Sequence, residues 1–303
     1  MKVSIITPTF NHGKFIAECI ESVLAQTETS WEQIVIDDCS TDGTPDIVTR
    51  YRDPRIRLLR TTTRNGVENL SRTYNQALAS TSADLVAVLE GDDYWPPHKL
   101  ASQCAAFDTK QVVLTWGQTA RDVGGRIENS VACRASLTRL RHPKSTQWLL
   151  MANAIGAVTV MVRKAALEEI GGFYQVPGTV VVDYSTWLRL CRVGEFRYVP
   201  KILGFWRIHG TQTTRVRRRE VFAGTVRIVE DALRTWEKPC GNSTHLRRFA
   251  TAQICLCRGV ISHLDRAFLR AMAFYLRALC KFHCAERASA TKLAMKAACL
   301  RPL

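Results

Sequence analysis

The stretch Leu85-Val86-Ala87-Val88-Leu89-Glu90-Gly91-Asp92-Asp93 decides the fold. Its five apolar residues, bounded by polar ones, predict a buried strand of a parallel sheet. Carboxylates that follow such a strand lie outside its carboxyl end, where open α/β sheets bind ligands. Three carboxylates this close repel one another, so a cation between them would stabilise the cluster. Taken alone, the triplet is equally consistent with a solvated turn that ends a strand.

The residues around this stretch alternate between strand and helix signals. Apolar runs predict strands at Val3–Thr7, Gln33–Asp37, Ile56–Leu59 and Leu85–Leu89. Apolar residues at helical spacing predict helices at Lys14–Gln26, Pro45–Tyr51 and Glu68–Ala79. This β-α-β-α order predicts an α/β fold with a doubly wound, mostly parallel sheet. No G-x-G-x-x-G turn follows the first strand, which argues against a dinucleotide-dependent dehydrogenase.

The rest of the chain is patterned differently. From about residue 114 to 209, short strand signals mix with helix signals near Arg163–Ile170 and Asp183–Arg192. After Gly210 the spacing is almost wholly helical, with stretches to about Trp236 and then at Leu246–Leu264 and Phe268–Ala298. We therefore expect a domain over residues 1–210 and a helical C-terminal extension over residues 211–303.

The chain has 303 residues and a formal charge of +15, and most of the excess lies in its last third. From Gln212 to Leu303 there are 18 Lys and Arg residues against 6 Asp and Glu residues. This basic extension has two main interpretations: helices packed on the domain with a solvated charged face, or reversible docking on an anionic membrane surface. No nucleic-acid-binding motif accompanies the charge, so we expect no nucleic acid partner.

The eleven cysteines are scattered through predicted strands and helices and form no pair of CxxC motifs. This pattern favours free thiols in a reducing compartment over a disulfide framework or a zinc site. The N-terminus enters a strand without the features of a signal peptide, and no run of about 18 apolar residues occurs. We expect a cytoplasmic protein, with a peripheral position at the inner face of the cell membrane if the extension docks there.

Three further polar segments follow predicted strands or open predicted helices. They are Thr7-Pro8-Thr9-Phe10-Asn11, Asp37-Asp38-Cys39-Ser40-Thr41-Asp42-Gly43-Thr44, and Asp183 after the apolar run Val180–Val182. Each has a plain interpretation, as a turn or as a helix N-cap. A carboxylate at the end of a strand can also accept hydrogen bonds from a nucleobase or ribose.

Together with the acidic triplet, these segments resemble the family 2 inverting glycosyltransferases of the GT-A fold over roughly residues 1–210. The matching segments, in chain order, are Thr7–Asn11, Asp37–Thr44, Asn65–Gly66 with Arg72 and Asn75, Glu90–Pro96, Arg163–Leu167 with Gly171–Phe173, Asp183–Leu190 and Trp206–Gly210. The resemblance implies a GT-A type sheet and a nucleotide-sugar-binding catalytic domain.

The resemblance also implies roles for residues near the strand ends. Asp38 would read the uracil edge of a nucleotide, and Thr7 and Pro8 would line the same pocket. Asp92 and Asp93 would hold ribose and a divalent metal, either Mg²⁺ or Mn²⁺, with Asp93 as the direct ligand.

Four later residues have roles implied in the same way. Asp183 matches the general base that takes a proton from the acceptor hydroxyl. Arg207 and His209 lie where the family has diphosphate or metal contacts, although an ordered loop histidine is an equally plain interpretation of His209. Arg72 could reach a phosphate or could be a solvated helix residue.

The chain departs from the family pattern at three positions. Glu90 replaces the more common first Asp of the signature, and its longer side chain leaves its role at the metal open. Val182 stands where many relatives have a second carboxylate before the base, and Cys39 interrupts the Asp-Asp-Gly-Ser pattern. Asp93 and Asp183 are both retained.

The function that the resemblance implies is metal-dependent, inverting transfer of a sugar in surface polysaccharide biosynthesis. The donor would be a nucleotide-sugar, with UDP as the expected nucleotide, and the acceptor a glycan or a lipid-linked acceptor. The alternative is a non-catalytic scaffold that binds a nucleotide or carbohydrate and recruits partners through its basic helices.

Overall fold

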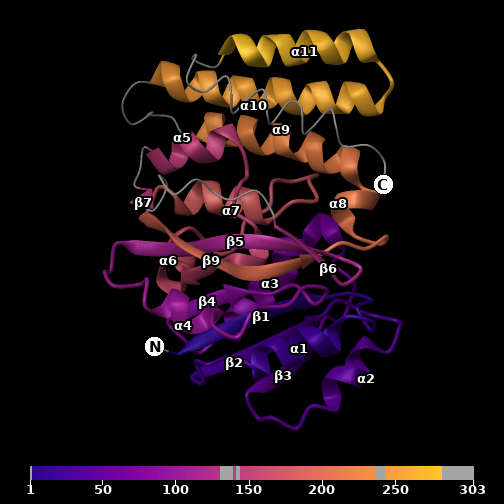
Figure 1. Cartoon of the computed structure of the whole chain (residues 1–303), viewed down its shortest axis with the longest axis vertical. Helices are drawn as coiled ribbons and strands as arrows, with labels where there is room; N and C mark the ends of the chain where they lie inside the picture. Colours follow the sequence, from indigo (N-terminus) through magenta and orange to yellow (C-terminus); the bar gives the residue numbers. More distant parts are fainter. Residues whose placement is uncertain (1, 130–138, 141–143, 236–242, 282–303) are drawn as a thin grey trace.

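The computed structural model describes residues 2–129, 139–140, 144–235 and 243–281, and its first four strands form a parallel sheet (Figure 1). The strands are β1 (Val3–Thr9), β2 (Trp31–Asp37), β3 (Ile56–Arg60) and β4 (Leu85–Val88). β1 lies between β2 and β4 and is parallel to both, and β2 is parallel to β3. The α/β fold with a doubly wound parallel region is therefore confirmed.

Strands β1, β2 and β4 are buried along their whole length, so their two faces are both covered and they lack an alternating pattern, whereas β3 at the edge of the sheet is only partly buried. Ile6 and Val88 belong to the core on one face, while Ile5 and Leu85 belong to the core on the other. Helices α1 (Ile16–Leu24), α2 (Thr44–Thr49) and α3 (Leu70–Ala79) connect successive strands. Helices α1 and α3 lie within their predicted ranges, and α2 begins one residue before its predicted range and ends two residues before the end of that range.

The second half of the sheet contains strands of both directions. Helix α4 (Lys99–Cys104) is followed by β5 (Val112–Val123), β6 (Arg126–Asn129), β7 (Arg139–Leu140), β8 (Met161–Arg163) and β9 (Glu195–Arg207). Strand β8 is antiparallel to both β4 and β5, whereas β5 and β9 are parallel. Among the described residues the strand order is β3-β2-β1-β4-β8-β5-β9-β7, with β6 paired to β5.

Helices α5 (Lys144–Met151), α6 (Lys164–Glu169) and α7 (Asp183–Leu190) lie in the region of mixed signals. Trp187 of α7 and Trp116 of β5 are fully buried in the larger core, which joins this region to the parallel strands. The predicted helices at Arg163–Ile170 and Asp183–Arg192 are thus present in slightly shorter form.

Helices continue to the end of the described chain as α8 (Thr213–Val216), α9 (Arg218–Thr235), α10 (Ser243–Leu264) and α11 (Phe268–Lys281). Figure 1 shows α9, α10 and α11 stacked in succession beyond α7, with α11 farthest from β2 and β3. The part of the predicted Phe268–Ala298 helix after Lys281, and Trp236, lie outside the described residues. None of the helices within the described ranges combines the length and apolarity needed to cross a bilayer.

Candidate active site

The acidic triplet forms a compact turn at the carboxyl end of β4. One carboxylate oxygen from each of Glu90, Asp92 and Asp93 lies within 4.8 Å of the others. The Gly91 N–H donates to the carbonyl of Pro8 at 3.0 Å, which ties the turn to β1. Asp93 is only 1% exposed, so the interpretation as a solvated turn is wrong.

Gly91 is required by the close approach of the β1 segment. A Cβ at this position would lie 2.7 Å from Thr9 Oγ1 and 2.9 Å from His12 Nδ1. Both of these buried atoms have no hydrogen-bond partner among the described residues. Two polar atoms left unpaired beside three carboxylates are consistent with a site that binds a ligand.

The three carboxyl groups have different electrostatic environments. Burial, together with the charges of Asp92 and Glu90, holds the pKa of Asp93 well above its usual range. Burial and the charge of Asp92 raise the pKa of Glu90 to about 7, although the Tyr74 hydroxyl donates to its Oε1 at 2.8 Å. Burial also opposes ionisation of Asp92, but the nearby His12 and the hydrogen-bonded His209 lower its pKa on balance.

Two histidines approach the same oxygen of Asp92. Nε2 of His209 lies 3.0 Å from Asp92 Oδ2, and Nε2 of His12 lies 3.9 Å from it. Burial lowers the pKa of His12, which favours its neutral form. The structure therefore brings His209 to the acidic turn, as the matching segment predicts. His12 was not identified from the sequence; its position directly after the Thr7–Asn11 segment was the available signal.

Arg207 contacts the site through its backbone. Its N–H donates to Asp93 Oδ1 at 2.9 Å, so the end of β9 is joined to the acidic turn. Its guanidinium points elsewhere, donating to Glu18 Oε2 at 2.6 Å and lying 3.9 Å from Asp122 Oδ2. These contacts favour a positioning role over a direct diphosphate contact.

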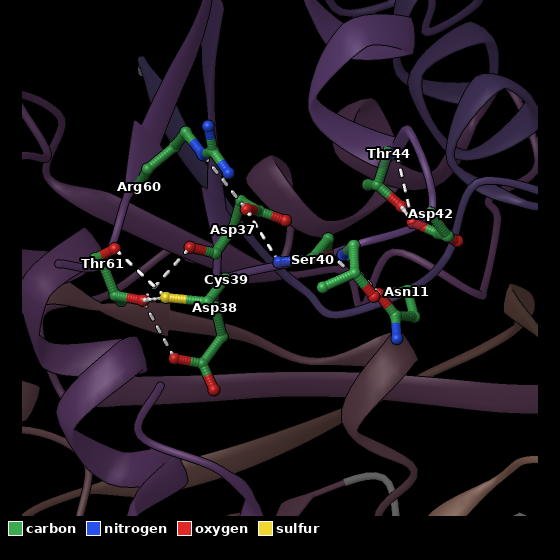
Figure 2. Close-up of polar contacts among 10 residues, drawn as sticks. Asn11, Asp37, Asp38, Cys39, Ser40, Asp42, Thr44, Arg60 and Thr61 are labelled. Carbon is green, nitrogen blue, oxygen red and sulfur yellow. Dashed lines mark hydrogen bonds and ion pairs between the residues drawn. The ribbon is translucent and has the colours of Figure 1, made fainter. Parts of the chain in front are cut away.

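Asp38 organises the loop that follows β3 (Figure 2). Its Oδ1 accepts hydrogen bonds from the Thr61 hydroxyl at 3.1 Å and the Asn65 N–H at 2.8 Å. Its Oδ2 accepts one from the Gly66 N–H at 2.8 Å. The carboxylate is thus positioned by backbone and side-chain donors at the end of β2, the strand next to β1.

The departure at Cys39 has a local explanation. Cys39 adopts φ of 63°, the left-handed conformation in which the family's glycine would be unstrained. Its Sγ lies 3.3 Å from the Thr61 carbonyl and hydroxyl oxygens, contacts that a glycine could not make. Figure 2 shows this thiol beside Thr61 and Asp38.

The remaining nucleotide-site candidates differ in exposure to solvent. Thr7 is fully buried and its hydroxyl accepts a hydrogen bond from Gln33 Nε2 at 3.0 Å. Pro8 is buried in β1, and Arg72 is exposed on α3.

Asp183 is the first residue of α7. Its carboxylate accepts hydrogen bonds from Asn153 Nδ2 at 3.1 Å and the Tyr184 N–H at 2.7 Å. Burial raises its pKa. Its charge raises the pKa of both Glu90 and Tyr74, which places Asp183 in the electrostatic surroundings of the triplet. Asn153 could not be identified from the sequence, because it lies 30 residues before Asp183 and belongs to no recognisable motif.

The profile of the protein family described as Glycosyl transferase family 2 matches residues 4–171, more than half of the chain. The chain belongs to glycosyl transferase family 2. A relative from Bacillus subtilis, described as "Putative teichuronic acid biosynthesis glycosyltransferase TuaG", is 32% identical over 202 residues, covering 65% of this chain and 74% of the relative. The Escherichia coli "UDP-Glc:alpha-D-GlcNAc-diphosphoundecaprenol beta-1,3-glucosyltransferase WfgD" is 29% identical over 63% of this chain and 70% of its own.

Solved structures of other glycosyltransferases share the fold of this family 2 enzyme. Staphylococcus aureus TarS 1–349, crystallised with UDP-GlcNAc, superposes with a TM-score of 0.67 at 17% identity, covering 98% of this chain and 91% of the other. The mannosyltransferase PcManGT from Pyrobaculum calidifontis, solved with GDP-Man and Mn²⁺, gives a TM-score of 0.65 at 19% identity, with coverage of 98% and 80%. The predicted GT-A type fold and glycosyltransferase class are confirmed.

Proposed function

We propose that this glycosyltransferase transfers a sugar from a nucleoside diphosphate donor, with UDP as the expected nucleotide, to a hydroxyl group of a glycan or lipid-linked acceptor. The transfer inverts the anomeric carbon and serves surface polysaccharide biosynthesis. The proposal rests on the close triplet of Glu90, Asp92 and the buried Asp93, with His209 against Asp92 and with Asp183 in the same electrostatic surroundings.

The donor set fits a divalent cation. Carboxylate oxygens suit Mg²⁺ and Mn²⁺, and an imidazole beside them is compatible with Mn²⁺. Burial and the charges of Asp92 and Glu90 outweigh the nearby Arg207 and raise the pKa of Asp93, so a bound cation would stabilise its ionised form. Asp93 and His209 would hold the ion, with Asp92 contacting ribose or sharing the metal. A bound cation would neutralise the negative charge on the diphosphate leaving group.

The nucleotide would lie between the ends of β1, β2 and β4. Asp38 Oδ2 accepts a single hydrogen bond from the described residues, which leaves a lone pair for an N–H of the base. Thr7 and Pro8 would support this pocket from β1. Arg72 is proposed as a phosphate contact because it is exposed and cationic, whereas Arg207 would position Asp93.

Asp183 is proposed as the general base. A carboxylate at this position would take the proton of the acceptor hydroxyl as the hydroxyl oxygen attacks the anomeric carbon. The raised pKa of Asp183 makes it a stronger base than an exposed aspartate. A single base without an enzyme nucleophile gives attack opposite the leaving group and hence inversion.

The names of the relatives and structural neighbours support the donor and acceptor classes. WfgD is named for a UDP-sugar donor and a diphosphoundecaprenol-linked acceptor, and TarS was crystallised with UDP-GlcNAc. We extend these classes to this chain, with residues 1–210 as the nucleotide-sugar-binding and catalytic domain and residues 211–303 as a basic helical extension. A lipid-linked acceptor would place the enzyme peripherally at the inner face of the membrane.

The test is donor cleavage by the purified chain. We expect Mn²⁺-dependent release of UDP from at least one UDP-sugar, abolished by Asp183→Asn while UDP binding, measured by calorimetry, changes less than about threefold. Asp93→Ala should remove both turnover and the metal dependence of UDP binding. The proposal would be overturned if the protein cleaved none of the common nucleotide-sugars and if UDP binding were undetectable or independent of metal.

A further inference from the structure

Helix α11 has one face packed on the protein and another face exposed. Figure 1 shows it as the outermost element of the C-terminal stack, with α10 between it and α9. Ala271 and Ala278, seven residues apart and hence on the same side, are buried against the fold. Tyr275 and Leu279 extend this packed side as partly buried residues. The inner face of α11 is therefore packed against the rest of the protein.

The outer face carries large apolar side chains. Phe268, Leu269, Met272 and Leu276 are between 55% and 81% exposed. Their spacing places them on one stripe of the helix surface, beside the packed side. Scattered exposed apolar residues need no explanation, but four on one stripe of a single helix mark an interaction surface.

The charge around this stripe has one sign. Arg266, Arg270, Arg277 and Lys281 are exposed next to or on α11, and the helix itself contains no acidic residue. Over residues 243–281 there are seven Lys and Arg residues and one acidic residue, Asp265. Asp265 is already engaged by Arg219 at 3.0 Å. The apolar stripe is thus flanked by uncompensated positive charge.

We propose that this outer face of α11, defined by Phe268, Leu269, Met272, Leu276 and the flanking basic residues, docks the enzyme on an anionic lipid bilayer. Apolar side chains would enter the acyl boundary while Arg and Lys contact anionic headgroups, the arrangement of an interfacial helix. A second copy of the chain is a poorer occupant, because face-to-face pairing would oppose like charges. The inference rests on the proposed function and deepens it by naming the surface that would bring the enzyme to a lipid-linked acceptor.

The experiment is co-flotation of the full chain with vesicles of phosphatidylcholine, with and without 30 mol% phosphatidylglycerol, a composition of roughly physiological charge. We expect binding to the anionic vesicles only, weakened as salt is raised. Leu269→Glu with Met272→Glu should reduce binding about tenfold or more, and Arg270→Gln with Arg277→Gln about thirtyfold. Ile127→Glu is the matched control, since it replaces another exposed apolar residue far along the chain, on β6.

Mn²⁺-dependent UDP binding is measured on the same samples, so a failure of the membrane-docking proposal can be distinguished from a failure of the proposed function. Equal binding of wild type and α11 variants, or equal loss with Ile127→Glu, would show that the face of α11 is not responsible. A melting temperature lowered by more than a few degrees in the Leu269 variant would show that other residues of the chain cover this face. Self-association lost on substitution, with no vesicle binding by the wild type, would assign the face to a second copy.

Discussion

Asp93→Asn should make the metal-free protein more stable while abolishing its response to metal. Asp93 is buried beside Asp92 and Glu90, with oxygens within 4.8 Å, and its pKa is raised by burial and by those charges. An asparagine keeps an oxygen for the Arg207 N–H that Asp93 Oδ1 accepts at 2.9 Å. Its amide group can also donate toward the neighbouring carboxylates. The substitution therefore removes repulsion and leaves the backbone contact.

The size of the effect follows from the separation of the charges. Two unit charges about 4.8 Å apart repel by roughly 3 kcal/mol at an effective dielectric constant of about 20. Partial protonation reduces this repulsion, so we expect Asp93→Asn to gain about 1–3 kcal/mol in stability and about 2–5 °C in Tm. A carboxyl group whose pKa is raised on folding destabilises increasingly as pH rises, so the gain should be larger at pH 8 than at pH 5.

The assay is urea unfolding in EDTA and then in Mn²⁺, with Asp92→Asn as the matched control. Asp92→Asn relieves the same repulsion but also loses the pair with His209 at 3.0 Å, so it should be about 1–2 kcal/mol less stable in EDTA than Asp93→Asn. At 100 times its Kd, Mn²⁺ should stabilise the wild type by about 2.7 kcal/mol and Asp93→Asn by almost nothing. An Asp93→Asn variant less stable than wild type in EDTA, or an Asp92→Asn variant as stable as Asp93→Asn, would refute the electrostatic argument.

Three further predictions concern neighbouring residues. Because the pKa of Glu90 rises from 4.5 to about 7 on folding, its contribution to the free energy of unfolding falls by up to about 3 kcal/mol between pH 5 and pH 8. Glu90→Gln should therefore flatten the dependence of this free energy on pH, measured by urea unfolding in EDTA. The same pH dependence in variant and wild type would contradict this prediction. Gly91→Ala should lower the free energy of unfolding in urea by about 1–3 kcal/mol, because the added Cβ would lie 2.7 Å from Thr9 Oγ1. The control is Gly210→Ala, whose Cβ would have no neighbour within 4 Å and which should change stability by less than about 1 kcal/mol. Equal effects of the two substitutions would rule out the steric argument. Asn153→Ala should lower kcat about tenfold with UDP affinity unchanged, since it removes a hydrogen bond to the base, and a parallel loss of UDP affinity would instead place Asn153 at the donor.

Local patterns were sufficient for the parallel half of the sheet. Strands such as Val3–Thr9 and Leu85–Val88 are buried on both faces, so their apolar runs are visible without knowledge of their neighbours. Strand β8 was not identified, because three residues, Met161–Arg163, are too few to show a period. Its antiparallel place between β4 and β5 follows from sheet pairing that no local pattern contains.

The sequence by itself determined the fold class, the family and the three carboxylates at the end of β4. Only the tertiary structure decided how those carboxylates differ in their contacts and in the direction of their pKa shifts. His209, which lies 117 residues after Asp92 in the chain, contacts the Asp92 carboxylate, while the backbone N–H of Arg207 donates to the buried Asp93. The reason is physical: periodicity is set by adjacent residues, but the pKa of a carboxyl group depends on its burial and on charges brought from distant segments.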